Sequence, residues 1–150
     1  MIGDDEMAEE RTLVLVKPDG VKQRHIGQVI TRLEQRGYTI EALKVVNATM
    51  EQLKDHYADL ADKPFFPEIT TYMQEGPITA IVAQGTNIVE VFHRMAGGTN
   101  PTQAELGTIR GDFGREWADG LIRNVVHSSD SAESAEREIK VWFPELGDTL

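Results

Sequence analysis

The stretch "RTLVLVKPDG", from Arg11 to Gly20, predicts a buried strand that ends in a sharp turn. Its middle is a continuous run of leucine and valine, which is typical of a strand covered on both faces. The Pro-Asp-Gly segment then favours a turn, because proline presets φ and glycine accepts positive φ. Lys17 therefore stands at the end of a strand, directly before a change of chain direction.

The segments that follow alternate between helical and strand patterns. Ile26, Val29, Ile30 and Leu33 recur at helical spacing, and Gly37 closes that helix. The order of elements predicts an α+β fold of the ferredoxin-like βαββαβ type, with a four-stranded antiparallel sheet and helices packed on one face. The remaining expected elements are a strand over 38–46, a helix over 50–60, another helix after Pro64, a strand over 77–84, a helix over 87–95, an irregular glycine-rich stretch over 97–120, a strand over 121–127 and a helix from about Ser131.

Composition limits the class of protein and its partners. A chain of 150 residues is expected to form a single domain over 11–150, after an acidic and disordered tail over 1–10. Cysteine is absent, so disulfides and thiolate chemistry are excluded. There is neither a signal peptide nor an apolar run of roughly 20 residues, and we expect a cytoplasmic protein without a membrane partner. The net charge of −10 disfavours nucleic acid as a partner and is also compatible with a salty habitat.

His127 stands between an apolar strand pattern and the turn that begins the last helix. A lone histidine in such a place is more often a hydrogen-bonded interior residue than a catalyst. Three features favour catalysis here. Sites gather at strand ends, the following helix N-terminus suits a phosphate, and a neutral imidazole is a competent nucleophile. Both interpretations stay open from spacing alone.

Glu138 is the carboxylate that spacing places nearest to His127. It follows Ser131 by seven residues and Ser134 by four, so these three share one helical face. From there Glu138 could fix the tautomer of the imidazole, although a solvent-facing glutamate is the commoner outcome. Asp130 has the spacing of a capping-box residue at the start of the same helix.

Five further positions could contact a nucleotide. Lys17 could reach phosphate oxygens as a point charge, and Arg110 lies between glycines that allow close backbone approach. Thr99 offers a hydroxyl in a turn. An exposed lysine and a plain glycine-rich loop are the competing interpretations. Tyr57 and Phe65 lie near a helix end, where aromatic rings are usually core, although an exposed ring could stack on a base.

The common phosphate-binding loops are absent from the sequence. It contains no G-x-x-x-x-G-K-[ST] and no G-x-G-x-x-G after a strand. The four histidines do not have zinc-ligand spacing. A nucleotide enzyme of this sequence therefore needs another way to hold phosphates.

Five segments together resemble nucleoside diphosphate kinases: "RTLVLVKPDGV", "HYADLADKPFFPEI", "TNP", "GTIRGDF" and "RNVVHSSDSAESAEREIKVWF". The resemblance is collinear from Arg11 to Phe143. It implies a ferredoxin-like domain that moves the terminal phosphoryl group from a nucleoside triphosphate to a diphosphate. It also implies two half-reactions through a phosphohistidine, Mg²⁺ bridging the phosphates, and dimers that assemble into tetramers or hexamers.

The resemblance also assigns roles to individual residues. It implies that His127 is the nucleophile, that Glu138 orients it and that Ser129 lies nearby. It implies phosphate or transition-state contacts for Lys17, Tyr57, Thr99 and Arg110, base stacking for Phe65 and sugar binding for Asn124. Stacking on one phenyl face tolerates any base, so broad nucleotide specificity is expected.

The chain departs from the family pattern at the end of the third strand, which reads "VAQG" where an aromatic is common and concerns packing, and at two positions that concern chemistry. Ser128 follows the histidine where the family usually has glycine, and His93 stands where a phosphate-binding arginine is usual, with Arg94 one place later. Either residue could take the arginine's role. Rival functions are a histidine phosphocarrier, which would not need Phe65 or Asn124, and a weakly active homologue that mainly binds nucleotide.

Overall fold

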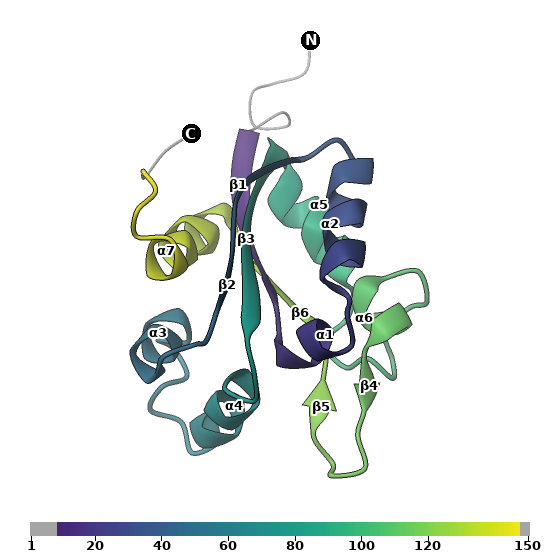
Figure 1. Cartoon of the computed structure of the whole chain (residues 1–150), viewed down its shortest axis with the longest axis vertical. Helices are drawn as coiled ribbons and strands as arrows, with labels where there is room; N and C mark the ends of the chain where they lie inside the picture. The colour runs from purple at the N-terminus through teal and green to yellow at the C-terminus, as the bar shows by residue number, and fades with distance from the viewer. Residues whose placement is uncertain (1–8, 148–150) are drawn as a thin grey trace.

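The computed structural model describes residues 9–147, which form a four-stranded sheet, a two-stranded sheet and the helices around them (Figure 1). No helix in this part of the chain is long and apolar enough to cross a membrane. The strands are β1 (Glu9–Val16), β2 (Thr39–Val46), β3 (Ile78–Thr86), β4 (Arg115–Glu116), β5 (Ile122–Arg123) and β6 (Val126–Ser128). The helices are α1 (Pro18–Lys22), α2 (Ile26–Gln35), α3 (Met50–His56), α4 (Phe66–Met73), α5 (Ile88–Ala96), α6 (Ile109–Phe113) and α7 (Ala132–Trp142).

The larger sheet has the strand order β2-β3-β1-β6, and each neighbouring pair is antiparallel. The strand β1, which contains the run of leucine and valine, lies inside this sheet. It pairs with β3 along its whole length and with β6 near its end, where Leu15 faces His127. The predicted ferredoxin-like sheet is confirmed, and its topology brings the last strand beside the first.

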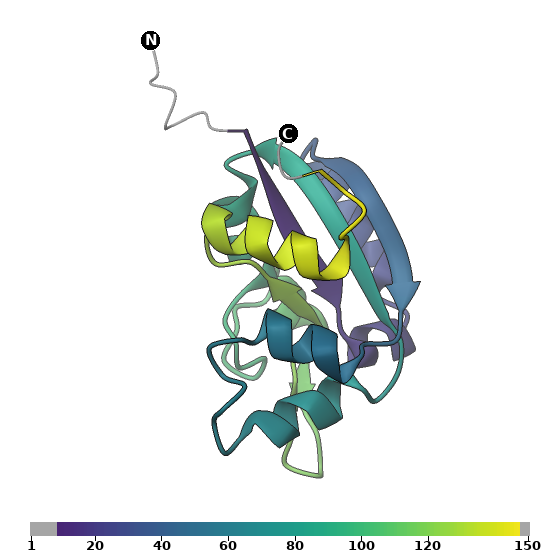
Figure 2. The ribbon, with the colours of Figure 1, turned by 90° about the vertical axis from the view of Figure 1, so that its left-hand side faces the viewer.

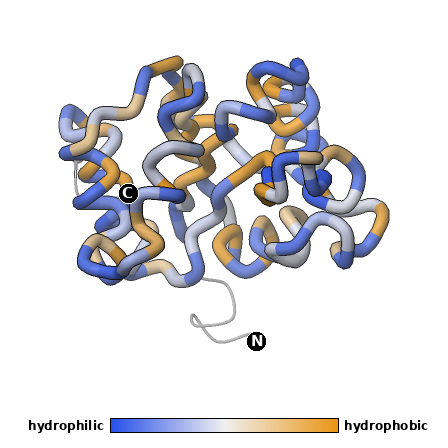
Figure 3. Tube along the Cα trace, turned by 90° about the horizontal axis from the view of Figure 1, so that it is seen from below, coloured by the Kyte–Doolittle hydropathy of each residue, from blue (hydrophilic) through white to orange (hydrophobic). Residues whose placement is uncertain are grey.

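Helices cover both faces of the sheet, so the prediction of a single covered face is wrong. Leu13 and Leu15 of β1 pack with residues of α3, α4 and α7, whereas Val14 and Val16 pack with α2 and α5. All four side chains are fully buried, and the two helical layers lie on opposite sides of the sheet (Figures 1 and 2). Hydrophobic and hydrophilic stretches alternate along the helices (Figure 3), as expected when each helix buries one face. The sequence pattern fixes which elements form but not the face to which each connection crosses.

The predicted strand over 121–127 is divided between two sheets. β5 pairs with β4 in a hairpin, whereas β6 joins β1. Between them Val125 has a φ of 73°, a left-handed conformation that β-branched residues rarely adopt. Val125 thus redirects the chain from the hairpin into the main sheet. The stretch over 97–120, predicted to be irregular, also contains α6 and β4.

Several element ends differ from the prediction. α3 ends at His56, short of the expected boundary, and β1 begins at Glu9, within the segment expected to be a tail. The remainder of that segment, 1–8, lies outside the described residues. The capping box expected at Asp130 is also wrong, because Ser131 caps α7 by accepting a hydrogen bond from the backbone N–H three residues later.

Candidate active site

His127 lies in the edge strand β6 with its side chain on the face that α7 covers. Its pairing with Leu15 directs both side chains to the same face of the sheet. The imidazole Nε2 lies 2.8 Å from Oε1 of Glu138. An ionised carboxylate can only accept, so Nε2 carries the proton and Nδ1 keeps its lone pair. Burial lowers the pKa of His127 against the opposing effect of Glu138, which favours the neutral, nucleophilic imidazole.

Glu138 is a buried carboxylate that is fixed from two sides. Its Oε1 accepts hydrogen bonds from His127 and from the hydroxyl of Ser129, the latter at 2.7 Å. Ser129 is itself fully buried, and its Oγ accepts the N–H of Leu13 at 3.2 Å. Glu138 is only 6% exposed, so the alternative of a solvent-facing glutamate is wrong. The contact expected between Glu138 and His127 is present.

Sequence reasoning missed His56, which lies against the His127 ring. The ring centroids are 4.4 Å apart in an edge-to-face arrangement. Trp142 donates its indole N–H to Nδ1 of His56 at 3.0 Å, and burial lowers the pKa of His56 to about 2. His56 is therefore a neutral ring packed against His127. Its sequence signal is the spacing of three residues from buried Leu53, which places both on one helical face.

Lys17 lies between β1 and α1, and its amine is held by a side-chain amide. Its Nζ donates to Oδ1 of Asn124 at 2.9 Å and lies 5.4 Å from the centroid of the Tyr72 ring. Burial and the charge of Arg110 lower the pKa of Lys17 to about 7, with a smaller opposing effect of Asp19. An anion placed beside this amine would favour its charged form.

Arg110 is a buried cation oriented by neutral groups. Its guanidinium donates to the backbone carbonyls of Gly97 and Val126, both at 2.8 Å. Its Nε has no hydrogen-bond partner within residues 9–147. Burial lowers the pKa of Arg110, opposed by nearby tyrosines. Carbonyl partners hold the fork in place without neutralising its charge, which suits an anionic ligand.

Asn124 lies two residues before β6 and connects this part of the chain to the loop that carries Thr99. While its Oδ1 accepts from Lys17, its Nδ2 donates to the backbone carbonyl of Thr99 at 3.0 Å. The Thr99 side chain is exposed. The loop begins at Gly97, whose φ is 90° and where a Cβ would lie 2.4 Å from the Thr108 hydroxyl. Glycine at this position permits the close approach of the backbone to Thr108.

The two predicted aromatic residues lie in different environments. Tyr57 contacts the His56 ring edge-to-face at 4.6 Å. Burial and the charge of Glu138 raise its pKa, and Arg110 lowers it, so its hydroxyl shares the surroundings of these two charges. Phe65, at the start of α4, is 47% exposed, whereas Phe66 is buried in the core. The exposed ring of Phe65 is the one free to stack on a ligand.

Asp19 fixes the chain two residues before His127, a contact that sequence reasoning missed. Its carboxylate accepts from the Tyr72 hydroxyl at 2.6 Å and from the backbone N–H of Val125 at 3.1 Å. This holds Val125 in its left-handed conformation, which costs on the order of 1–3 kcal/mol. Turn chemistry alone accounts for Asp19 in a Pro-Asp-Gly motif, so the sequence carries no signal for this contact.

Two of the three possible metal donors near His127 already accept hydrogen bonds. His56, His127 and Glu138 offer ligand atoms within 4.8 Å of one another. However, Nδ1 of His56 accepts from Trp142, and Oε1 of Glu138 accepts from His127. This donor set suits a metal ion that is carried by phosphate oxygens and water rather than by a protein cage.

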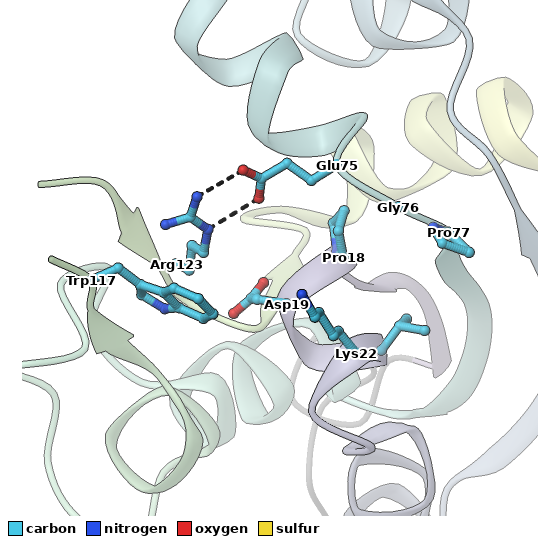
Figure 4. A pocket seen from close by; sticks show the side chains of 9 residues that line it. Pro18, Asp19, Lys22, Glu75, Gly76, Pro77, Trp117 and Arg123 are labelled. Carbon is cyan, nitrogen blue, oxygen red and sulfur yellow. Dashed lines mark hydrogen bonds and ion pairs between the residues drawn. The ribbon is translucent and has the colours of Figure 1, made fainter. Parts of the chain in front are cut away.

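A cavity of about 650 Å³ lies beside α1, between the Gly76–Pro77 segment and the β4–β5 hairpin (Figure 4). Trp117 and Arg123 line it from the hairpin, and Arg123 donates to Glu75 at 3.0 and 2.7 Å. None of the residues that sequence reasoning placed in the site lines this cavity. The residues predicted for the site therefore lie outside the lining of this cavity.

Comparison with known proteins agrees with this geometry. The family model for nucleoside diphosphate kinase matches residues 10–147. The nucleoside diphosphate kinase of Streptococcus thermophilus is 48% identical over 136 residues, covering 91% of this chain and 99% of that protein. Nucleoside diphosphate kinase B of Mus musculus is 48% identical over 134 residues, covering 89% of this chain and 86% of that protein.

Solved structures show the same relationship. The nucleoside diphosphate kinase of Encephalitozoon cuniculi superposes with a TM-score of 0.81 at 40% identity, covering 89% of this chain and 88% of that chain. The enzyme of Aquifex aeolicus superposes with a TM-score of 0.81 at 34% identity, covering 91% and 96% respectively. The chain belongs to the nucleoside diphosphate kinase family, enzymes that transfer a phosphoryl group between nucleotides with the help of a divalent metal.

Proposed function

We propose that the chain transfers the terminal phosphoryl group of ATP to nucleoside diphosphates through a phosphohistidine at His127. The observation that carries this proposal is the contact between Nε2 of His127 and Glu138 at 2.8 Å. It leaves the lone pair of Nδ1 for nucleophilic attack. A neighbouring buried carboxylate also stabilises the positive charge that develops on a phosphorylated imidazole ring.

The reaction runs in two balanced half-reactions. Nδ1 of His127 attacks the terminal phosphorus, an N–P bond forms, and the bond from phosphorus to the bridging oxygen breaks to release the diphosphate. An oxygen of the incoming diphosphate then attacks the same phosphorus, and the N–P bond breaks. The proton on Nε2 stays beside Glu138 throughout. Positioning and charge stabilisation supply the catalysis.

We assign phosphate binding to Lys17, Arg110 and the Thr99 hydroxyl, and sugar binding to Asn124. The two cations have neutral hydrogen-bond partners, so a triphosphate would supply the charge they lack. Tyr57 is placed at the attacked centre because its hydroxyl shares the surroundings of Glu138 and Arg110.

Phe65 is proposed to stack on the base from the rim of the site. Its ring is 47% exposed. A phenyl face stacks on any base, which supports broad nucleotide specificity. The required divalent metal is proposed to be Mg²⁺, which prefers phosphate oxygens and water with few protein ligands.

We further propose that residues 11–150 act as one catalytic domain in a cytoplasmic homo-oligomer built from dimers, either a tetramer or a hexamer. Leu43 and Val45 support association of copies. They belong to the edge strand β2 and are 45% and 59% exposed, and exposed apolar edges are typical of pairing surfaces.

The proposal is tested by incubating the protein with γ-labelled ATP and Mg²⁺ and then adding GDP. The label should be acid-labile and should pass to GDP. An acid-stable label would place the phosphate on a hydroxyl instead. A labelled protein that GDP cannot discharge would be a phosphocarrier and would overturn the kinase proposal.

His127→Ala should abolish labelling and transfer but leave nucleotide binding, because the variant removes only the nucleophile. His25→Ala is a matched control, since His25 bonds Gln28 and stacks on Phe113 elsewhere in the molecule. Nucleotide binding is followed by calorimetry with ADP. Transfer that persists in His127→Ala would refute the assigned role.

A further inference from the structure

His93 and Ser128, the two departures from the family pattern that concern chemistry, contact each other. Nδ1 of His93, in α5, lies 2.9 Å from Oγ of Ser128, in β6. The usual pair of arginine and glycine cannot form this hydrogen bond, because glycine has no side chain. The two departures therefore form one structural feature.

The contact acts on the strand that carries the nucleophile. In β6, His127 pairs with Leu15 and faces α7, whereas Ser128 pairs with Val14 and faces the opposite layer. The backbone of β6 is thus held from both faces. Glu138 bonds the imidazole on one face, and His93 bonds the next residue on the other.

The same helix leads into the phosphate-binding loop. α5 ends at Ala96, one turn after His93. The next residue, Gly97, accepts a hydrogen bond from Arg110, and Thr99 accepts one from Asn124. A contact between α5 and β6 therefore relates the position of the nucleophile to the position of this loop.

We propose that His93 and Ser128 are positioning residues for phosphoryl transfer, and that their hydrogen bond fixes β6 against the end of α5 from which the phosphate-binding loop departs. The proposal rests on the function proposed above. A serine hydroxyl both donates and accepts, so the bond forms with either tautomer of the imidazole.

Arg94 does not take over the position of its neighbour. α5 is one continuous helix from Ile88 to Ala96, without a slip that would bring Arg94 to the place of His93. Both His93 and Arg94 are exposed and line a surface cavity with Gly97 and Gly98. The imidazole of His93 hydrogen-bonds Ser128 through Nδ1. A variant of Arg94 therefore separates the two candidates.

The central test compares Ser128→Ala, His93→Ala and the double variant by steady-state transfer from ATP to a diphosphate. Each single variant should lower kcat by roughly tenfold, less than the ~100-fold that a 1 Å misplacement can cause. KM should stay within about twofold, because the ligands of the nucleotide are retained. The double variant should be no slower than the slower single variant. Multiplying effects, or a loss confined to KM, would overturn the proposal.

Conservative and exchanged pairs provide rescue. Ser128→Thr keeps the hydroxyl and His93→Asn keeps a polar atom near Nδ1, so both should retain most of kcat. His93→Arg combined with Ser128→Gly restores the usual family pair and should recover the activity that His93→Arg alone loses. Single variants that match the wild type, or an exchanged pair that is no better than His93→Arg, would contradict a matched pair.

Controls separate positioning from folding and from the function itself. Thr86→Ala removes a remote hydroxyl that bonds Glu9 at 2.7 Å, and Arg94→Ala removes the neighbouring cation; both should leave kcat and KM within about twofold. A KM increase in Arg94→Ala with normal His93 variants would assign the role to Arg94. Melting curves must show each variant folded at the assay temperature, and a melting shift with unchanged kcat would reduce the pair to a structural contact. Transfer by the wild-type protein tests the proposed function separately. If the wild type transfers phosphate and the His93 and Ser128 variants do so equally well, the positioning role is refuted and the proposed function stands.

Discussion

The half-buried Lys17 and the buried Arg110 differ from the buried Arg123 in the hydrogen-bond partners that the protein gives them. Beside His127, Lys17 donates to an amide and Arg110 to two backbone carbonyls. In the β5 region, Arg123 is paired with the carboxylates of Glu75 and Asp119 at 2.7 and 3.0 Å. The effects on pKa follow: burial lowers the pKa of Lys17 and Arg110, whereas carboxylate partners raise that of Arg123.

The difference indicates which part of the fold is suited to bind an anion. A cation with carboxylate partners is already neutralised and mainly stabilises its surroundings. A cation held by neutral groups keeps its charge for a ligand, and that costs stability in the free protein. In a chain with a net charge of −10, this local arrangement lets a polyanionic nucleotide bind.

The largest effect on activity is expected for Lys17→Met, which keeps the aliphatic part of the side chain and removes its charge. We expect kcat/KM to fall by roughly 10²–10³-fold, as for the loss of one preorganised charge contact in a water-excluded site. The free energy of unfolding should not fall, because a desolvated amine is lost. Steady-state transfer and urea unfolding measure the two quantities. A less active variant that is also clearly less stable would mean that Lys17 is structural.

The comparison extends to two aromatic rings. Trp117 lies between Arg115 and Arg123, whose guanidinium carbons are 4.8 and 4.6 Å from its ring centroid, whereas Phe65 is exposed at the rim of the site. Phe65→Ala should raise KM for nucleotides by about tenfold, the scale of one stacked base, with little change in melting temperature. Phe65→Trp should retain affinity. Equal KM values for wild type and Phe65→Ala would remove Phe65 from the site.

Arg123→Ala should show the opposite pattern from Lys17→Met. We expect a loss of about 1–2 kcal/mol in the free energy of unfolding, since a charge-assisted and partly buried pair is removed. Transfer should stay within about threefold of the wild type. Urea unfolding and steady-state kinetics are measured on the same preparation. A large loss of kcat with unchanged stability would place Arg123 in the catalytic region and erase the distinction.

A further expected effect is a pH dependence of stability that comes from Lys17. Its pKa is about 7 in the folded chain and 10.5 as an ordinary lysine. Between these values the unfolded chain binds a proton that the folded chain lacks, so this group makes the free energy of unfolding rise with pH. Below pH 7 both states are protonated and the contribution is constant. Urea unfolding at pH 7 and pH 9 should show a smaller rise for Lys17→Met than for wild type, whereas Arg123→Ala should keep the wild-type rise.

Local patterns of the sequence were sufficient for most of the sheet and for part of the site. Continuous apolar runs located β1, helical spacing located α2 and α7, and the same spacing placed Glu138 near His127. The roles of Lys17, Phe65 and Asn124 came from collinear resemblance, because an exposed lysine or phenylalanine carries no distinctive local signal.

Contacts that join distant parts of the chain were not predictable from the sequence. The turn at Val125 depends on Asp19, 106 residues away, and the donor to Nδ1 of His56 is the indole of Trp142, 86 residues away. The contact between His93 and Ser128 also needs the packing of α5 on β6. In each case the residue has an adequate local explanation, so nothing in its neighbourhood indicates the distant partner.

The amide of Val125 offers a separate measure of how often the turn before His127 opens. This N–H lies outside every helix and strand, and the carboxylate of Asp19 is its acceptor. Its hydrogen exchange with deuterated water therefore reports the free energy of opening this turn rather than of unfolding the sheet. Slow exchange at Val125 would identify a preorganised backbone before any nucleotide binds. Exchange that slows only with ADP present would show that the ligand completes the ordering of the turn at Val125.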